Sequence, residues 1–312
     1  MLDVRTKGNS AFDAVFSEGR MSIGLVLPVR TGSDDIDFRK QLELAALADE
    51  LGFSALWVRD VPLNGPWYPE PIGHLDPWVM LGALAARTRT IALGTAATVL
   101  PLRHPVHIAK SAVSLQALSG DRLLLGLGSG DRPEEYRAFN RDFESRRELF
   151  KAGWEELAAA FAAPSSITAG DTRFELRPVP TVAPPMLAIG SAGQSLDWIA
   201  RKARGWATYY REPAVQRDRH ALWRQAVTRG AGGGFRAFAV AMGITLNADA
   251  GEPPERLKLG YRTGVNGLAG ILDEQRALGV HHLMLNLETS GLPVRDALTQ
   301  VAQASGLTAS SG

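Results

Sequence analysis

The chain has 312 residues, of which 45% are apolar, and its 34 basic and 33 acidic side chains give a net charge of +1. Such a mixed, nearly neutral surface excludes the strong field that collects nucleic acid or anionic membrane, so we expect neither partner. The absence of cysteine excludes disulfides, thiolate catalysis and Cys-ligated metals. No apolar run reaches the ~20 residues of a membrane span, and residues 1–20 lack a signal peptide's apolar core, so we expect a soluble cytoplasmic protein.

Short apolar runs alternate with amphipathic segments along the first half of the chain. Asp37 and Asp76 are placed to cap helices, and Gly52 and Gly120 to end them. The pattern predicts strands at 22–28, 55–60, 90–96 and 122–128, and helices at about 37–52, 76–86, 106–118 and 145–163.

The alternation is interrupted once and then resumes. Residues 164–185 are rich in Pro, Ser and Thr and predict an irregular excursion with one extended arm rather than a domain boundary. The second half predicts strands at 186–190, 205–210, 235–246 and 281–287, and helices from about 194 and at 214–228, 265–279 and 293–304.

Eight strand–helix units with nearly continuous apolar strands indicate a parallel sheet that is buried on both faces. In a chain of this length they favour an α/β fold with one (β/α)8 TIM barrel, an open doubly wound sheet being the alternative. We expect the barrel over residues 21–304, with an N-terminal extension at 1–20 and a C-terminal tail at 305–312. In such a barrel the functional site forms at the C-terminal ends of the strands.

Two of the predicted strand ends are rich in glycine and other small residues. The first, at residues 190–195, joins a strand directly to a helix, so its free amides and the helix dipole favour a phosphate. The alternative is a tight turn in which Ser195 only caps the helix. The second, "LGLGSG" (125–130), has the wrong spacing for a dinucleotide fingerprint, and we interpret Gly128 as admitting a flat ligand to the backbone. The residues of the first strand end are Gly190, Ser191, Ala192, Gly193, Gln194 and Ser195.

Other catalytic arrangements find little support in the sequence. His104 and His107 are three residues apart, but no third ligand joins them, so we expect no metal site. No G-x-S-x-G motif indicates a serine hydrolase. Asp60, Asp131 and Glu288 follow predicted strands, and nothing in the sequence pairs them.

Several linked motifs give the chain a family resemblance over about residues 21–304. The densest are "GTAATVLPLRHP" (94–105), "LSGDRLLLGLGSG" (118–130) and "IGSAGQSLDWIARKARGW" (189–206). In this order they resemble the bacterial luciferase-like family of flavin-dependent monooxygenases.

The resemblance implies a (β/α)8 barrel that holds reduced FMN or, in one branch, a deazaflavin. The phosphate would lie on the 190–195 loop, and the ring over a bulge at Ala96 and Ala97 with a cis peptide bond between them, beside Gly128 and Ser129. The implied reaction uses dioxygen on a small organic substrate, and a separate reductase often supplies the reduced flavin. Asp60 and His104 are positioned to move protons or place the substrate, and members are often homodimers.

Two departures from the family limit what the resemblance implies. Asp60 aligns with a glutamate of the luciferases, but Val61 occupies the place of their histidine, and Ser129 that of a phosphate-binding arginine. We therefore do not expect light emission from long aldehydes. A deazaflavin-dependent dehydrogenase and a non-catalytic flavin-binding protein remain alternatives. A sugar-phosphate lyase or isomerase barrel would need a lysine or a metal, and no lysine lies on the strand ends that we expect to form the site.

Overall fold

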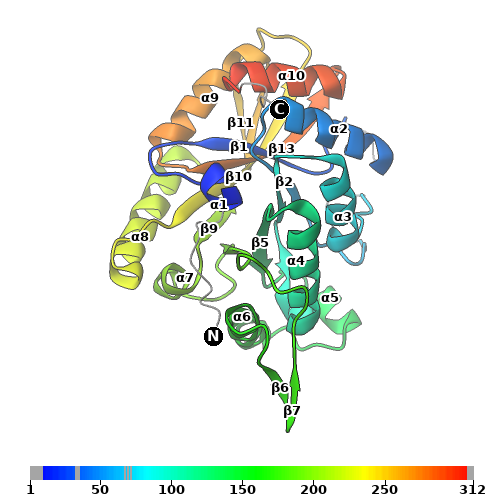
Figure 1. The fold of residues 1–312 in the computed structure, drawn as a ribbon. Coiled ribbons are helices and arrows are strands. Elements are labelled where there is room, and N and C mark those ends of the chain that lie inside the picture. The colour runs from blue at the N-terminus through cyan, green and yellow to red at the C-terminus, as the bar shows by residue number, and fades with distance from the viewer. Residues whose placement is uncertain (1–9, 32–35, 67, 69, 71, 308–312) are drawn as a thin grey trace.

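The computed structural model describes residues 10–31, 36–66, 68, 70 and 72–307. In this part of the chain eight parallel strands form a closed ring, because β1 pairs with β13, and β10 pairs with both β13 and β9 (Figure 1). The closed ring confirms the predicted barrel over the open sheet. The eight strands are β1 (Ser22–Val26), β2 (Ala55–Val58), β3 (Ala92–Thr95), β5 (Leu123–Gly128), β8 (Met186–Ile189), β9 (Gly205–Tyr209), β10 (Ala237–Asn247) and β13 (His282–Ser290).

A helix follows each strand and lies on the outside of the barrel (Figure 1). The predicted caps are confirmed, since the Asp37 and Asp76 carboxylates accept hydrogen bonds from the first amides of their helices, and Gly120 ends its helix at φ 69°. The helices are α2 (Phe38–Glu50), α3 (Pro77–Arg87), α4 (Pro105–Ser119), α6 (Arg146–Ala162), α7 (Leu196–Lys202), α8 (Pro213–Ala231), α9 (Val265–Ala277) and α10 (Val294–Ala304).

A short helix of the N-terminal extension, α1 (Ser10–Val15), packs against the start of the barrel. Phe12 and Phe16 belong to the same buried cluster as Trp57 and the other inward-facing side chains of the strands. The Ser22 hydroxyl, on the first residue of β1, donates a hydrogen bond to the Val15 carbonyl. The helix therefore covers the N-terminal end of the barrel, which leaves the opposite end for a ligand (Figure 1).

The barrel interior also contains a buried polar chain. The Trp57 indole donates to Nε2 of His282 at 2.9 Å, and Nδ1 of His282 lies 2.6 Å from the Ser22 hydroxyl. Burial lowers the pKa of His282 to about 3, so the ring is neutral at pH 7. Gly94 makes room for the indole, because a Cβ there would lie 2.4 Å from its ring atoms.

Several elements add to the predicted pattern. The excursion at 164–185 contains an antiparallel pair, β6 (Ile167–Ala169) and β7 (Thr172–Phe174), rather than one extended arm, and this hairpin projects away from the barrel (Figure 1). Beyond the ring, β12 runs parallel to the end of β10 and pairs with β11. None of the described helices has the length and apolarity to cross a membrane. The added elements are β4 (Thr98–Val99), the 3-10 helix η1 (Leu100–Leu102), α5 (Pro133–Ala138), β11 (Glu255–Leu257) and β12 (Gly260–Thr263).

Candidate cofactor site

The C-terminal end of the barrel has a floor of small side chains. Ala96, Ile189 and Ala241 lie partly buried on the inner core, with the fully buried Trp57 side chain in the layer below them. Each belongs to a different strand or strand end, and none carries a polar side chain. The floor is apolar, and its two alanines are short side chains, so it suits the face of a planar ring.

The bulge after β3 forms one side of this floor. The Ala96–Ala97 peptide bond is cis, as the resemblance implied. Gly128 is buried against the bulge, and a Cβ at this position would lie 3.0 Å from the Ala97 Cβ. A side chain at residue 128 would therefore crowd the bulge, and glycine leaves room for it at this side of the floor.

Tyr209 stands at the end of β9, three strands around the ring from β3 and its bulge. Its side chain is 62% exposed, although the strand behind it is buried. Such a large aromatic surface at the end of a barrel strand is available to a ligand. Sequence reasoning placed this residue on a strand end but gave it no role.

The loop after β8 has the backbone that phosphate binding requires. Gly190, Ala192 and Gly193 all have positive φ, which turns the chain sharply before α7. Within the described part of the chain, the amides of four loop residues donate no hydrogen bond, and a phosphate is a suitable acceptor for them. These residues are Ser191, Ala192, Gly193 and Ser195.

Two side chains of the loop have structural partners. The buried Gln194 amide donates to the carbonyls of Arg147 and Ala192, and the Ser195 hydroxyl accepts from the Trp198 amide as the cap of α7. Gly193 lies against the Arg147 side chain, because a Cβ at Gly193 would be 3.1 Å from the arginine Cγ. Gln194 and Ser195 therefore shape the loop with their side chains, and Arg147 brings a cation next to it.

The opposite side of the barrel mouth carries polar atoms without partners. Arg30 and Glu288 form an ion pair at 3.1 Å between the ends of β1 and β13. The Arg30 Nε donor and the Asn286 Oδ1 acceptor are nevertheless buried with no hydrogen-bond partner among the described residues. Buried polar atoms are normally paired. One unused donor and one unused acceptor fit the mixed carbonyl and N–H edge of a flavin or deazaflavin ring.

Asp60 lies beneath this mouth with both of its oxygens occupied. Its carboxylate accepts hydrogen bonds from the Val99 amide at 3.0 Å and from two nitrogens of Arg103 at 2.8 and 2.7 Å. Arg103 also pairs with Asp76 at 2.8 Å. These contacts fix the chain directly after the bulge, so Asp60 positions the floor. The proton-transfer role expected for Asp60 stays a prediction.

His104 is exposed on the rim at the start of α4. Its Nδ1 accepts a hydrogen bond from the Val106 amide at 3.2 Å, so the ring caps the helix. The expected His104 role in substrate placement also stays a prediction, because no described contact joins this ring to the floor. Ser129 lies next to the floor, and its hydroxyl donates only to the neighbouring Gly130 carbonyl.

A cluster of polar residues borders the mouth beyond β2. Arg59 forms a 2.7 Å ion pair with Glu70, and the Tyr68 hydroxyl lies 3.2 Å from Nε2 of His74. The guanidinium of Arg132 stacks 4.3 Å from the centre of the Tyr68 ring. Burial first, and then the charge of Arg59, lowers the pKa of His74 to about 4, so this imidazole is neutral at pH 7.

A family model described as luciferase-like monooxygenase matches residues 21–277. The chain belongs to this family. Two curated relatives show its range. A 4-hydroxyprotoasukamycin monooxygenase of Streptomyces nodosus subsp. asukaensis is 30% identical over 184 residues, 55% of this chain and 48% of that protein. An F420-dependent glucose-6-phosphate dehydrogenase of Amycolatopsis mediterranei is 34% identical over 115 residues, 36% and 33% of the two chains.

The matched stretch spans about half, or less, of the length of these curated relatives. A solved structure, monooxygenase RslO1 from Streptomyces bottropensis, superposes with a TM-score of 0.72 at 21% identity, covering 92% of this chain and 97% of that one. This likeness shows the same fold over 92% of the chain.

Sequence reasoning missed several residues of the luciferase-like site. Arg30, Arg59 and Asn286 lie on strand ends that we expected to face the site, but nothing in the sequence shows which of their atoms lack partners. His74 lies in a loop 15 residues after Arg59, and only the fold brings the two together. For Arg30, Arg59 and Asn286, the position at a strand end is the one signal that the sequence offers.

Proposed function

We propose that the chain is a flavin-dependent oxidoreductase, a monooxygenase that uses reduced FMN and dioxygen on a small organic substrate. The observation that carries this proposal is the apolar floor of Ala96, Ile189 and Ala241, on the same barrel mouth as the unpartnered Arg30 Nε and Asn286 Oδ1. A planar ring with a polar edge matches both features. The reduced flavin would supply the electrons that activate dioxygen.

The chain's own residues would bind and orient this cofactor. The free amides of the 190–195 loop would hold the phosphate, with the Arg147 side chain alongside. The floor would support one ring face, and Tyr209 has exposed aromatic surface for an apolar contact at the mouth. The covered N-terminal end of the barrel and the buried layer below the floor would keep water from that face.

The charges around the mouth favour an uncharged substrate. Arg30 pairs with Glu288, Arg59 with Glu70, and Arg132 with Glu135 at 2.8 Å. Each of these arginines therefore already has a carboxylate partner, and an anionic substrate would have to displace one. The neutral His74 imidazole and the Tyr68 hydroxyl offer hydrogen bonds instead of charge.

The cofactor proposal is tested by titrating the full chain with FMN, riboflavin and F420 and following fluorescence. We expect FMN to bind more tightly than riboflavin, which lacks the phosphate. A Gly193→Ala variant, strained at φ +72°, should lose FMN affinity and leave riboflavin affinity nearly unchanged. A Gly128→Val variant should weaken both flavins at least tenfold. No binding of any of the three compounds would overturn the proposal.

A deazaflavin-dependent dehydrogenase is the second candidate, because one of the relatives is named as F420-dependent. Two assays with the same panel of neutral organic substrates separate the monooxygenase from the dehydrogenase. One supplies reduced FMN, oxygen and a flavin reductase, and the other supplies F420 under nitrogen. Substrate-dependent oxygenation supports the monooxygenase, and substrate-dependent F420 reduction supports the dehydrogenase. Tight FMN binding without turnover in either assay identifies a non-catalytic flavin carrier and refutes the catalytic proposal.

We also propose a separate reductase as the source of reduced flavin and a homodimer as the assembly. Mixing with a flavin reductase under limiting FMN tests the first, since product should then depend on both proteins. Light scattering after size-exclusion chromatography tests the second, with twice the 33.6 kDa chain mass as the expected value.

A further inference from the structure

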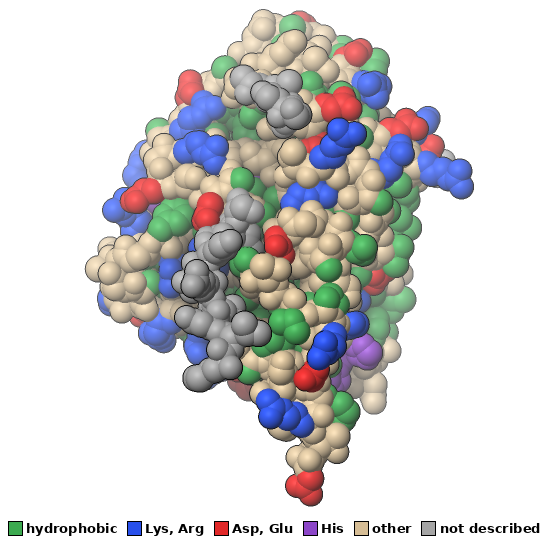
Figure 2. Space-filling model, viewed as in Figure 1, with side chains coloured by type: hydrophobic (Ala, Val, Ile, Leu, Met, Phe, Trp, Pro, Cys, Tyr) green, Lys and Arg blue, Asp and Glu red, His purple; other side chains and the backbone are tan. Residues whose placement is uncertain are grey.

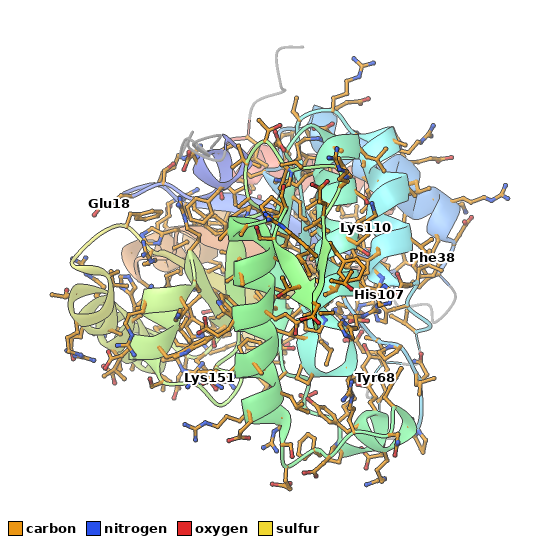
Figure 3. All side chains as sticks on the ribbon, turned by 60° about the horizontal axis from the view of Figure 1, so that its bottom comes forward. Glu18, Phe38, Tyr68, His107, Lys110 and Lys151 are labelled. Atoms are coloured by element: carbon orange, nitrogen blue, oxygen red, sulfur yellow. The ribbon has the colours of Figure 1, made fainter. Side chains whose placement is uncertain are left out.

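A pocket of about 420 Å³ lies at the N-terminal end of the barrel, away from the candidate cofactor site. Its walls come from the later part of α8, the end of α9, and the residues that directly precede β1, β10 and β13. Figure 3 shows Glu18, on the loop before β1, and Tyr68, beside the mouth, on opposite sides of the molecule. A ligand in this pocket therefore belongs to a site separate from the barrel mouth.

The charge of this N-terminal pocket is strongly basic. Among the described residues that line it, Glu18 is the single acidic side chain, against the four arginines 20, 224, 236 and 276. This imbalance is local, because the whole chain carries a net charge of only +1. Figure 2 shows Lys and Arg side chains along the edge of the molecule where α8 and α9 lie. The pocket thus concentrates positive charge in a concave surface.

Several of these cations have donors to spare. Arg224 is exposed, and its guanidinium has no ion-pair or hydrogen-bond partner within the described part of the chain. Arg236 is held in place by two hydrogen bonds, from Nε to the Ala200 carbonyl and from Nη1 to the Phe235 carbonyl. Its Nη2 is not used in either bond. Arg236 is thus held in place by backbone carbonyls, and the Arg224 side chain is free to bind an anion.

His281 adds a fixed neutral donor to the same wall. Its Nδ1 accepts a hydrogen bond from the Phe238 amide at 2.9 Å, which places the proton of the neutral ring on Nε2. Burial, His220 and Arg224 together lower the pKa of His281 to about 4, so the ring is neutral at pH 7. The Nε2–H group has no partner among the described residues and can donate to an anion.

Aromatic rings form the rest of the pocket. The His281 ring lies 5.1 Å from Phe235 and 6.4 Å from His220, and Trp223 contributes a further wall. Gly279 is required for this packing, because a Cβ there would lie 2.2 Å from the His220 ring. A ligand with a flat ring can therefore contact aromatic side chains while its anionic group contacts the arginines.

From these observations we propose that the N-terminal pocket binds a phosphorylated planar compound of the nucleoside monophosphate class. Its volume lies within the range of small-molecule sites, about 300–1,000 Å³. Arg276 pairs with Asp273 at 2.5 Å, whereas the other three lining arginines have no carboxylate partner among the described residues. A phosphate dianion matches these three cations better than a single carboxylate does.

The test uses AMP as the probe and the full chain without added flavin, since FMN is also a planar monophosphate and would compete for the pocket. Calorimetry at low salt should show one AMP site, and Arg224→Ala and Arg276→Ala should each weaken it at least fivefold. Arg217→Ala is the matched control, because Arg217 is an exposed, unpaired arginine on the same helix but does not line the pocket. The control should bind AMP within twofold of the wild type.

A second readout locates the ligand. AMP should shift the His220 and His281 ring resonances in NMR spectra, and those of His104 and His107 should stay unchanged. His281→Asn keeps an acceptor for the Phe238 amide and removes the Nε2–H donor, so it should weaken AMP without unfolding the protein. Absence of AMP binding at 5 mM, or equal binding by Arg217→Ala, Arg224→Ala and wild type, overturns the proposal. If inorganic phosphate binds as tightly as AMP, the proposal that the pocket recognises a planar ring is overturned.

Discussion

Replacing Asp60 by alanine separates a positioning role from a catalytic one. The change removes the acceptor of three hydrogen bonds from Val99 and Arg103, at a side chain that is 2% exposed. Removing one partner of a buried ion pair costs about 3–5 kcal/mol. Arg103 is 26% exposed and keeps Asp76 at 2.8 Å, so we expect a loss below this range, about 2–3 kcal/mol.

The assay is chemical and thermal unfolding together with FMN titration. A loss of this size corresponds to a Tm decrease of roughly 3–5 °C for a chain of this size. FMN affinity should fall as well, since Asp60 holds the residues after the bulge. Asp60→Asn keeps the shape and part of the hydrogen bonding, so it should lose less stability and retain the pH profile of turnover.

Asp76→Ala is the control, because Asp76 is more exposed and acts mainly as a helix cap, worth about 1 kcal/mol. The positioning argument is refuted if Asp60→Ala is no less stable than Asp76→Ala. It is also refuted if Asp60→Asn keeps wild-type stability and FMN affinity but loses turnover more than a hundredfold. That result would assign proton transfer to Asp60.

Three further predictions follow from the described contacts. Gly94→Ala places a Cβ 2.4 Å from the Trp57 ring and should lower the free energy of unfolding by about 1–3 kcal/mol in urea titrations; wild-type stability would contradict the packing. His282 has a folded pKa of about 3, so below pH 6.5 only the unfolded chain takes up its proton, and stability should fall by about 2–3 kcal/mol between pH 7 and 4.5. His282→Gln should flatten that slope, and an unchanged slope would rule out this histidine as its source. Tyr209→Ala should change stability by less than about 0.5 kcal/mol but weaken FMN several-fold, and equal FMN affinity would exclude a ring contact.

The barrel was predictable because its signals are local. Each buried strand is a short apolar run, and the Asp37, Asp76 and Gly120 caps mark helix ends within a few residues. The elements that were missed lack such signals. Helix α1 has only six residues and depends on the barrel for its burial, and β12 pairs with β10 only because the fold brings them together.

The candidate site divides in the same way. The Gly190–Ser195 loop and the Ala96–Ala97 bulge are continuous in sequence, so their small residues were visible as motifs. Asp60 and Arg103 are separated by 43 residues, and no periodicity indicates that one neutralises the other. The partnerless atoms of Arg30 and Asn286 are defined by three-dimensional packing, which a sequence pattern does not report.

The unequal length of the barrel strands makes the rim of the barrel lopsided. β10 and β13 pair over nine residues up to Asn247 and Ser290, and β12 flanks their ends, whereas β2 and β3 have four residues each. Gly24 pairs with both Met284 and Ala55, so the end of β2 is level with Leu287, three residues before the end of β13. At about 3.3 Å per residue, this difference extends one side by roughly 10 Å along the strand. On that side the regular strands themselves form the wall of the mouth, whereas beyond β2 and β3 the wall is built from loop residues and η1. We therefore expect a substrate to reach the floor from the side of β2 and β3, and an elongated substrate to lie along β10 and β13.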